Sequence, residues 1–129
     1  MENQDEKKKI LLVDDDEIQH KIAENMLCDK YQVFMAKSGE EALNYLYNKA
    51  FIPNLILLDI LMPEMDGWEV FNRIRAISLL KNVPIVFLTA LNESSEEKRA
   101  FDLGADDFIT KPYNKDNLLS RIEKLIDKD

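Results

Sequence analysis

Short runs of consecutive apolar residues alternate along the chain with longer segments in which apolar residues recur at helical spacing. Unbroken apolar runs are typical of strands that are buried on both faces, as in a parallel sheet. We expect five such strands, at Ile10–Val13, Tyr31–Ala36, Leu55–Leu58, Pro84–Ala90 and Phe108–Ile109. The run at 31–36 includes Gln32, which favours a place at the edge of the sheet.

Helices are predicted between these runs and after the last one, because apolar residues recur there three or four positions apart. In chain order, the apolar positions are Ile18, Ile22, Ala23, Met26 and Leu27; Ala42, Leu43 and Leu46; Val70, Phe71, Ile74 and Ile77; Ala100, Phe101 and Leu103; and Leu118, Leu119, Ile122, Leu125 and Ile126. The fourth set is the thinnest, so we expect that helix to be held loosely. This alternation predicts an α/β fold, with a doubly wound, parallel, five-stranded sheet and helices on both of its faces.

Several helix boundaries carry local signals. Ser38 and Ser94 each precede a glutamate by three residues, the pattern of a capping box. Asp66 suits the N-cap of the third helix, and Gly104 suits a left-handed end to the fourth.

Composition limits the class of protein. Apolar residues make up 46% and charged residues 33% of 129 residues, which is typical of one soluble globular domain. The formal net charge of −8, with no basic run beyond residues 7–9, argues against direct binding of nucleic acid or anionic lipid. The apolar runs are too short to span a membrane.

The N-terminal segment and the single cysteine indicate the compartment. The start, MENQDEKKK, has no apolar core behind it and is not a signal peptide. We expect residues 1–8 to form a flexible lead-in to one domain over residues 9–127. Cys28 is the only cysteine, which fits a reducing cytoplasm, and its place among apolar residues predicts a buried filler.

Polar residues end four of the five apolar runs. They are Asp14, Asp15 and Asp16 after the first run, Asp59 after the third, Thr89 at the end of the fourth, and Lys111 after the fifth. Because ligands of such sheets collect at the carboxyl ends of the strands, we expect these groups to share one edge. Carboxylates ~4 Å apart repel by about 1 kcal/mol in water and about 4 kcal/mol at an intermediate effective dielectric.

A divalent cation would cancel this repulsion, since converging carboxylates form a hard oxygen site for Mg²⁺. An amine and a hydroxyl beside the cation suit the oxygens of a phosphoryl group, and an aspartate aimed at phosphorus can form an acyl phosphate. Each residue also has a simpler interpretation. An aspartate after a strand is often only a helix N-cap, a terminal threonine is often a surface hydroxyl, and a lysine is often solvated. Their joint placement favours the shared site.

The segments VDDD, LLDILMPEMDG, FLTA and GADDFITKP occur in an order and at separations that resemble the receiver domain of bacterial two-component response regulators. The resemblance extends from Lys9 to about Ile126, and LLDILMPEMDG is its most specific part. It implies a flavodoxin-like fold with strand order 2-1-3-4-5.

The resemblance also implies roles for the acidic residues. Asp59 matches the phosphoacceptor. Asp14, Asp15 and Asp59, with the backbone carbonyl of Leu61, match the ligands of Mg²⁺, for which Mn²⁺ or Ca²⁺ can substitute. Asp15 would bind the ion directly and Asp14 mostly through water.

Lys111 matches the lysine that pairs with the phosphoryl oxygens, and a cis bond to Pro112 is implied. Thr89 and Phe108 match the switch residues: the hydroxyl closes on the phosphoryl group and leaves space into which the ring turns. Phe108 as ordinary core filler is the alternative.

The resemblance implies a phosphoryl donor, either a histidine kinase or a histidine phosphotransfer protein, and an output through a downstream protein or a covalently linked effector. The domain would be a signalling switch that turns over no separate substrate. A homodimer could form through the fourth helix, fifth strand and fifth helix. Its ion pairs would come from Lys98, Arg99, Asp106, Asp107 and Arg121, which could equally form a solvated face. A free-standing regulator and a fragment of a longer protein both fit the sequence.

Leu61 and Leu91 lie two residues after Asp59 and Thr89. Their apolar side chains cannot orient a hydrolytic water, so our hypothesis is a long-lived phosphoryl state.

His20 is the only histidine. A phosphohistidine carrier would be a helical bundle, so we expect His20 to be an exposed or partly buried helix residue. Trp68 is expected to pack at the start of the third helix.

Three other functions are less consistent with the sequence. An FMN-binding redox protein needs a phosphate loop after the first strand, where this chain has acids. A phosphatase of the haloacid dehalogenase type has a second acid and then a threonine at this point, whereas Asp16 is followed by Glu17. A degenerate receiver would lack some site residues, and here every matched position is filled.

Overall fold

The computed structural model describes residues 7–48 and 51–127. Strands and helices alternate through this part of the chain. In order they are β1 (Lys8–Val13), α1 (Glu17–Leu27), β2 (Tyr31–Ala36), α2 (Gly39–Tyr47), β3 (Leu55–Leu58), α3 (Gly67–Arg75), the short 3₁₀ helix η1 (Ser78–Leu80), β4 (Ile85–Thr89), α4 (Ser94–Leu103), β5 (Asp107–Thr110) and α5 (Lys115–Ile126).

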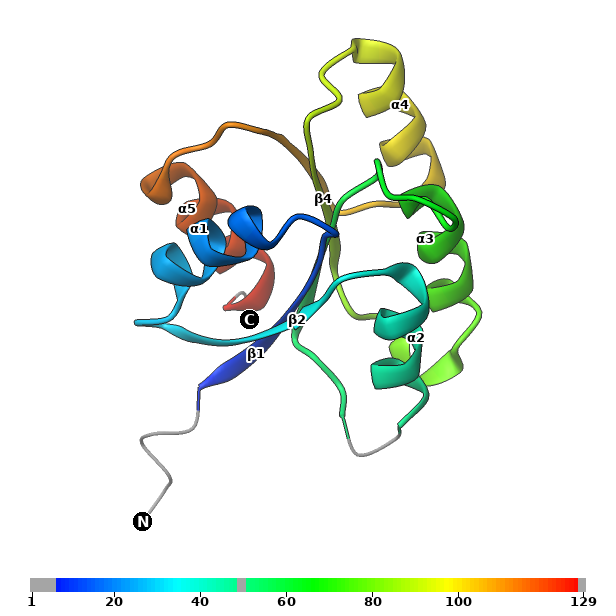
Figure 1. Ribbon diagram of the computed structural model, residues 1–129, viewed down its shortest axis with the longest axis horizontal. Coiled ribbons are helices and arrows are strands. Elements are labelled where there is room, and N and C mark those ends of the chain that lie inside the picture. The colour runs from blue at the N-terminus through cyan, green and yellow to red at the C-terminus, as the bar shows by residue number, and fades with distance from the viewer. Residues whose placement is uncertain (1–6, 49–50, 128–129) are drawn as a thin grey trace.

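The five strands form one parallel sheet in the order β2-β1-β3-β4-β5, which confirms both the predicted order and the edge position of β2. Helices cover both faces, with α1 and α5 on one side and α2, α3 and α4 on the other (Figure 1). Because all strands are parallel, their carboxyl ends lie at one edge of the sheet.

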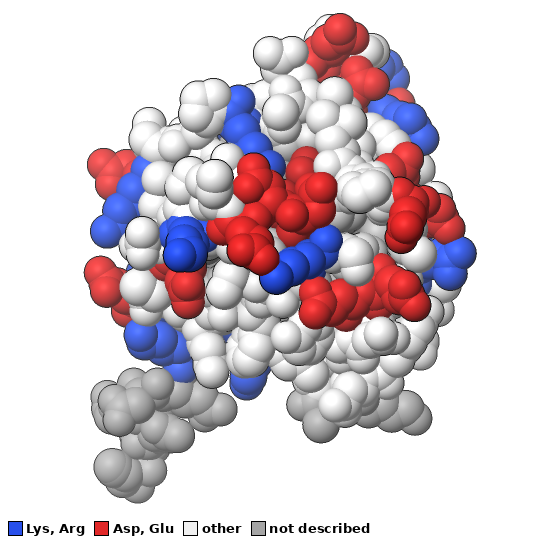
Figure 2. Space-filling view, in the orientation of Figure 1, with Lys and Arg blue, Asp and Glu red and all other residues white. Residues whose placement is uncertain are grey.

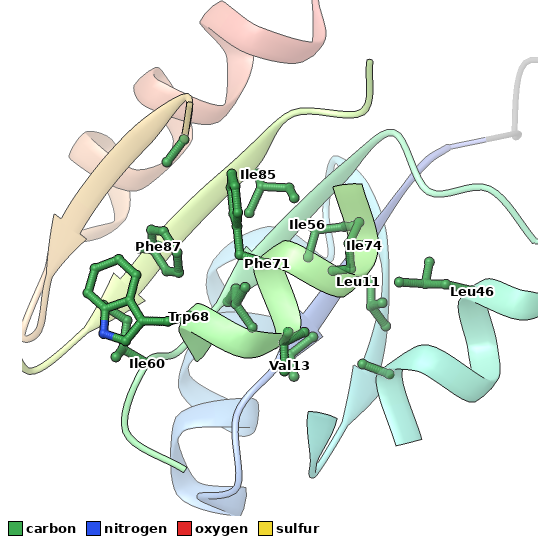
Figure 3. Packing of buried hydrophobic residues seen from close by; sticks show 14 of the residues in the cluster. Leu11, Val13, Leu46, Ile56, Ile60, Trp68, Phe71, Ile74, Ile85 and Phe87 are labelled. Atoms are coloured by element: carbon green, nitrogen blue, oxygen red, sulfur yellow. The ribbon is translucent and has the colours of Figure 1, made fainter. Parts of the chain in front are cut away.

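The strands bury side chains on both faces, as their unbroken apolar sequences predict. Every residue of β3 and β4 is buried. Toward α2, α3 and α4, the strand residues pack with Phe71 and Phe87, both fully buried (Figure 3). Toward α1 and α5, Leu12 and Leu57 pack with Leu118. Each such side chain stabilises the fold by roughly 1.5–3 kcal/mol relative to exposure.

Most predicted caps are confirmed. The Ser38 side chain accepts from the Glu41 N–H, the Asp66 side chain caps α3, and Gly104 is left-handed with φ 102°. The Ser94 cap is wrong. The N-cap of α4 is Glu93, whose carbonyl accepts from residues 96 and 97, so Ser94 is already the first helical residue.

The phase of α1 differs from the prediction. Ile18 and Ile22 are 68% and 37% exposed, while the buried residues are His20, Ala23 and Leu27. His20, expected to be exposed or partly buried, is therefore a core residue. Cys28, predicted to be buried, is exposed because it follows the last buried turn as the C-cap.

Helix α4 is held by a thin contact, as predicted. Ala100 is its only buried residue, and Phe101 and Leu103 are 44% and 40% exposed. At the other end of the chain, β1 begins at Lys8, the last residue of the expected lead-in, and residues 1–6 lie outside the described part. Within residues 7–48 and 51–127, no helix has both the length and the apolar character that crossing a membrane requires.

Candidate functional site

The sheet brings the predicted site residues together by extending its hydrogen bonding past the strand ends. The Asp14 N–H donates to the Ala36 carbonyl at 3.0 Å, and the Asp59 N–H donates to the Val13 carbonyl at 2.9 Å. The Lys111 N–H donates to the Thr89 carbonyl at 2.8 Å. Backbone bonds therefore fix the start of each loop that carries a polar side chain to this edge.

Three carboxylates converge there. Asp14, Asp15 and Asp59 each contribute one oxygen to a group whose members all lie within 4.8 Å of one another. Asp14 and Asp59 are buried, with 1% and 5% exposure, whereas Asp15 is exposed. Acidic side chains gather near the middle of the face shown in Figure 2, where β1 passes into α1. Asp16 is outside this group: its side chain caps α1 by accepting from the Ile18 N–H.

Lys111 lies against two of these acids. Its ammonium group is 2.6 Å from Asp14 Oδ2 and 3.5 Å from Asp59 Oδ2, and the lysine side chain is 13% exposed. The charge of one lysine is thus shared between carboxylates from β1 and β3. The bond from Lys111 to Pro112 is cis, as the resemblance implied.

The environment of Asp59 combines opposing effects. Burial raises the pKa of its carboxyl, and the negative charge of Asp14 adds to the rise. The positive charge of Lys111 is the strongest effect that lowers this pKa, followed by hydrogen bonds from the Thr89 side chain and the Leu61 N–H. The carboxylate form is therefore costly to bury but is held by three specific partners.

Thr89 and Leu61 lie beside this carboxyl group, and Leu91 contacts Thr89. Thr89 is fully buried at the end of β4, and its hydroxyl accepts from the Leu91 N–H at 3.3 Å. Asp59 Oδ1 accepts from the Leu61 N–H, also at 3.3 Å. The Leu61 side chain itself is 54% exposed, so an apolar group borders the open side of the site.

Phe108 lies in a chain of aromatic rings behind Thr89. It is 5% exposed, and its ring centroid is 6.4 Å from that of Phe87. Phe87 in turn contacts Trp68 at 5.1 Å and Phe71 at 5.6 Å between centroids (Figure 3). Phe108 therefore occupies the inward position in this structure, and Trp68 packs in the core as expected.

Two residues beside the site, His20 and Tyr113, were not predicted from the sequence to lie there. The His20 ring lies 2.6 Å from the Asp14 carbonyl oxygen, through Nε2. Tyr113 follows the cis proline; burial, and then the charge of Asp14, raise its pKa to about 12. The alternation of strand and helix gives no signal for either contact. The only signal for His20 in the sequence is its position, one turn into the helix that follows the acids.

The donor set fits a hard divalent cation. Three converging carboxylates supply only oxygen, which Mg²⁺ prefers, and the exposure of Asp15 leaves room for water, several molecules of which Mg²⁺ usually retains. Softer metals favour thiolate or imidazole ligands. Cys28 lies at the far end of α1, and the single imidazole points at a carbonyl.

Comparison with known proteins decides the family. Residues 10–123 match the response regulator receiver domain. The chain belongs to this family.

Receiver domains of known structure share the fold. A response regulator from Chloroflexus aurantiacus superposes with a TM-score of 0.87 at 33% identity, covering 95% of this chain and 100% of the other. The receiver domain of a sensor histidine kinase from Pseudomonas aeruginosa gives a TM-score of 0.86 at 27% identity over 95% of this chain and 100% of its own. That protein holds a magnesium ion coordinated in its active-site cleft.

Curated relatives of this receiver domain are longer proteins. The probable transcriptional regulator ycf27 of Porphyra purpurea is 40% identical over 127 residues, which are 98% of this chain and 49% of the relative. The chain thus spans about half the length of the curated relatives it matches.

Proposed function

We propose that this receiver domain accepts a phosphoryl group on Asp59 from the phosphohistidine of a histidine kinase or a histidine phosphotransfer protein. One observation carries the proposal: the ammonium group of Lys111 lies between buried carboxylates from two strands, 2.6 Å from Asp14 and 3.5 Å from Asp59. A structural ion pair needs one acid, whereas the carboxylates clustered here outnumber the lysine. The excess negative charge calls for a cation, and the lysine and that cation together would neutralise an incoming phosphoryl group.

The chemistry is a displacement at phosphorus. An oxygen of the Asp59 carboxylate forms a bond to phosphorus while the bond from phosphorus to the donor imidazole nitrogen breaks. The electron pair of that bond stays on the imidazole, which takes up a proton from solvent, and Asp59 becomes an acyl phosphate. Lys111 favours the ionised form of Asp59 that attack requires and then pairs with the phosphoryl oxygens.

Asp14, Asp15 and Asp59 would hold Mg²⁺ at this edge, with the carbonyl of Leu61 completing the protein ligands. The bound ion supplies positive charge to the phosphoryl oxygens and orients them. Oxygens of the three acids within 4.8 Å of one another support this assignment. Mn²⁺ and Ca²⁺ share the preference for oxygen and are expected to substitute.

Thr89 and Phe108 would convert this local event into a change of surface. The Thr89 side chain already lowers the pKa of the Asp59 carboxyl, and Phe108 is already buried. The expected effect of phosphorylation is therefore to fix Thr89 on the new oxygens and hold the ring inward, rather than to drive a large movement of the ring.

The output would be read by a protein at α4, β5 and α5, either a downstream target, a linked effector or a second copy of the domain. A cavity of about 290 Å³ there is lined by Glu97, Phe108, Tyr113 and Arg121, among others. Four of the five charges considered for dimer pairing have ion-pair partners within the chain. Arg121 bonds to Asp107 at 3.3 Å, Lys98 to Asp102 at 2.9 Å, and Asp106 pairs with Arg75 at 3.6 Å. We expect a switch that turns over no separate substrate, acts in the cytoplasm and makes no direct nucleic-acid contact through this domain.

Intact mass after incubation with acetyl phosphate and Mg²⁺ tests the proposal. The wild-type chain is expected to gain one phosphoryl group, and a chelator should prevent the gain. Asp59→Asn should gain none, while the matched control Asp16→Asn, which alters an acid outside the cluster, should be modified like the wild type. Equal uptake by Asp59→Asn would refute the assignment.

A further inference from the structure

His20 is a buried polar residue whose side-chain hydrogen bond is directed at the acidic site. It lies on α1 with 5% exposure, and its Nε2 atom is 2.6 Å from the carbonyl oxygen of Asp14. A backbone carbonyl can only accept, so Nε2 must carry the proton in this contact. The interaction is therefore a hydrogen bond from the imidazole to the peptide that joins Asp14 to Asp15.

This bond completes the fixation of Asp14. Its N–H donates to Ala36, its Oδ1 accepts from the Asp16 N–H at 2.9 Å, and its Oδ2 contacts Lys111. The carbonyl held by His20 is the remaining polar group of the residue. With it, every hydrogen-bonding group of Asp14 is engaged, and the peptide plane before Asp15 has one orientation.

Asp15 has no comparable support of its own. In the part of the chain that the structure describes, no hydrogen bond or ion pair holds its carboxylate, although one of its oxygens lies within 4.8 Å of those of Asp14 and Asp59. Its side chain is therefore aimed by its backbone. The backbone on the C-terminal side is fixed by the Asp16 cap of α1, and the backbone on the N-terminal side by the bond from His20.

We infer that His20 is a positioning residue: by donating from Nε2 to the Asp14 carbonyl, it orients the Asp14–Asp15 peptide and so aims the Asp15 carboxylate at the cation. The inference rests on the proposed function, because it assumes that these acids hold Mg²⁺. Groups that orient metal ligands from behind commonly set the affinity of a site, since a misaimed ligand binds weakly.

The test compares Mg²⁺ affinity in two variants of His20. His20→Phe keeps a ring in the core but removes the donor, whereas His20→Gln places an N–H donor at a reach similar to that of Nε2. Titration of ¹⁵N-labelled protein with Mg²⁺, followed through backbone amide signals, reports both the fold and the dissociation constant. We expect His20→Phe to weaken binding about tenfold, the lower end of the usual cost of losing such a partner, and His20→Gln to recover most of the loss.

Leu27→Val is the matched control, because Leu27 is a buried residue of the same helix that lies seven residues from His20. It should lower the melting temperature without changing Mg²⁺ affinity. Wild-type affinity in His20→Phe would overturn the inference while leaving the proposed function intact, and so would equally weak binding in His20→Gln and His20→Phe. Failure of the wild type to bind Mg²⁺ would overturn both.

A measurement on the unaltered chain keeps the inference testable even where a variant does not fold. Because the chain has one histidine, ¹⁵N labelling of histidine in untagged protein gives the signals of one ring. A proton on Nε2 that exchanges slowly with solvent is expected. A ring protonated only at Nδ1, or a rapidly exchanging Nε2 proton, would contradict the hydrogen bond.

Discussion

At the scale of single residues, Asp59 is held in a compromise between burial and charge. Burial stabilises the neutral form of a carboxyl group, whereas a carboxyl group that attacks phosphorus must be ionised. The partners Lys111, Thr89 and the Leu61 N–H offset part of the cost of ionisation. The remaining cost should appear as a loss of folding stability when Asp59 is ionised.

This cost predicts the pH dependence of an Asp59→Asn variant. Because the folded-state pKa of Asp59 is raised, its contribution to stability is fullest below the ordinary aspartate range and is lost as pH rises through the raised pKa. Asp59→Asn has no such loss, and Lys111 keeps its closer partner Asp14. The variant should match the wild type at low pH and exceed it in urea midpoint at pH 7, without added metal.

The control is Asp29→Asn, since Asp29 is exposed in the turn after α1. Its urea midpoint should follow the wild type at every pH. An Asp59→Asn protein that is less stable than the wild type at pH 7 would contradict the account of burial.

We expect Leu61 to govern a second residue-scale property, the lifetime of the acyl phosphate on Asp59. Its side chain is apolar and 54% exposed beside Asp59, where a water molecule would attack. Leu61→Asn supplies an amide that can orient this water, so loss of the phosphoryl group should be faster by on the order of tenfold. Decay of the phosphorylated mass with time measures the rate, with exposed Leu79→Asn as the control. Equal decay in wild type and Leu61→Asn would contradict the hypothesis.

At the scale of elements, the first turn of α3 packs against the backbone of Asp59, the proposed phosphoacceptor. A Cβ atom on Gly67 would lie 2.3 Å from the Asp59 carbonyl oxygen and 2.6 Å from the Ile60 Cα. The Gly67 N–H also donates to the Ile60 carbonyl at 2.9 Å. Only glycine lets the helix approach this closely, which explains its place at the end of LLDILMPEMDG.

Gly67→Ala should therefore both destabilise the fold, by about 1–3 kcal/mol as for other overpacked sites, and impair phosphoryl uptake, because the backbone of Asp59 must shift. Gly104→Ala is the matched control. Nothing lies within 4 Å of its added Cβ, but φ is +102°, so it should lose stability through backbone strain and keep normal uptake. Chemical unfolding and intact mass distinguish the two, and normal uptake by a folded Gly67→Ala would contradict the argument.

A cation–π contact joins α4 to α3. The Arg99 guanidinium lies 4.1 Å from the centroid of the Trp68 ring. Because Ala100 is the only buried residue of α4, we expect this contact to help hold the helix in place. Arg99→Gln should cost about 0.5–1 kcal/mol and speed hydrogen exchange in α4.

Lys98→Gln is the control for Arg99→Gln, since it removes only a solvent-exposed pair with Asp102, and such pairs contribute little to stability. It should leave exchange in α4 almost unchanged. Trp68 emission should also respond to Arg99→Gln alone. Equal hydrogen exchange in the two variants would show that the contact between Arg99 and Trp68 does not restrain the helix.

How much the sequence could predict at this scale depends on the element. Strands buried on both faces have one apolar pattern whatever their rotation, so β3 and β4 were predicted nearly to the residue. The phase of α1 was not, because Ile18 and Ile22 gave a stronger apolar signal than His20. A hydrogen bond to a carbonyl decides that histidine's burial, and no hydropathy pattern encodes such a partner.

At the scale of the molecule, parallel strands convert separate sequence motifs into one site. Asp14, Asp59, Thr89 and Lys111 are far apart in the chain but follow strands that end at the same edge. This rule explains why the acids, the hydroxyl and the lysine could be grouped from the sequence. The pairing of Lys111 with Asp14 more closely than with Asp59, and the inward position of Phe108, depend on side-chain packing that the motifs do not specify.

The most direct test of the central claim locates the phosphoryl group among the clustered acids. The wild-type chain is phosphorylated with acetyl phosphate and Mg²⁺, reduced with borohydride, which converts an aspartyl phosphate to homoserine, and mapped by peptide mass spectrometry. Homoserine at position 59, and at none of positions 14, 15 and 16, is the predicted result. Homoserine at position 14, the first-strand acid that a phosphatase of the haloacid dehalogenase type would use, or its absence from all four positions, would contradict the account.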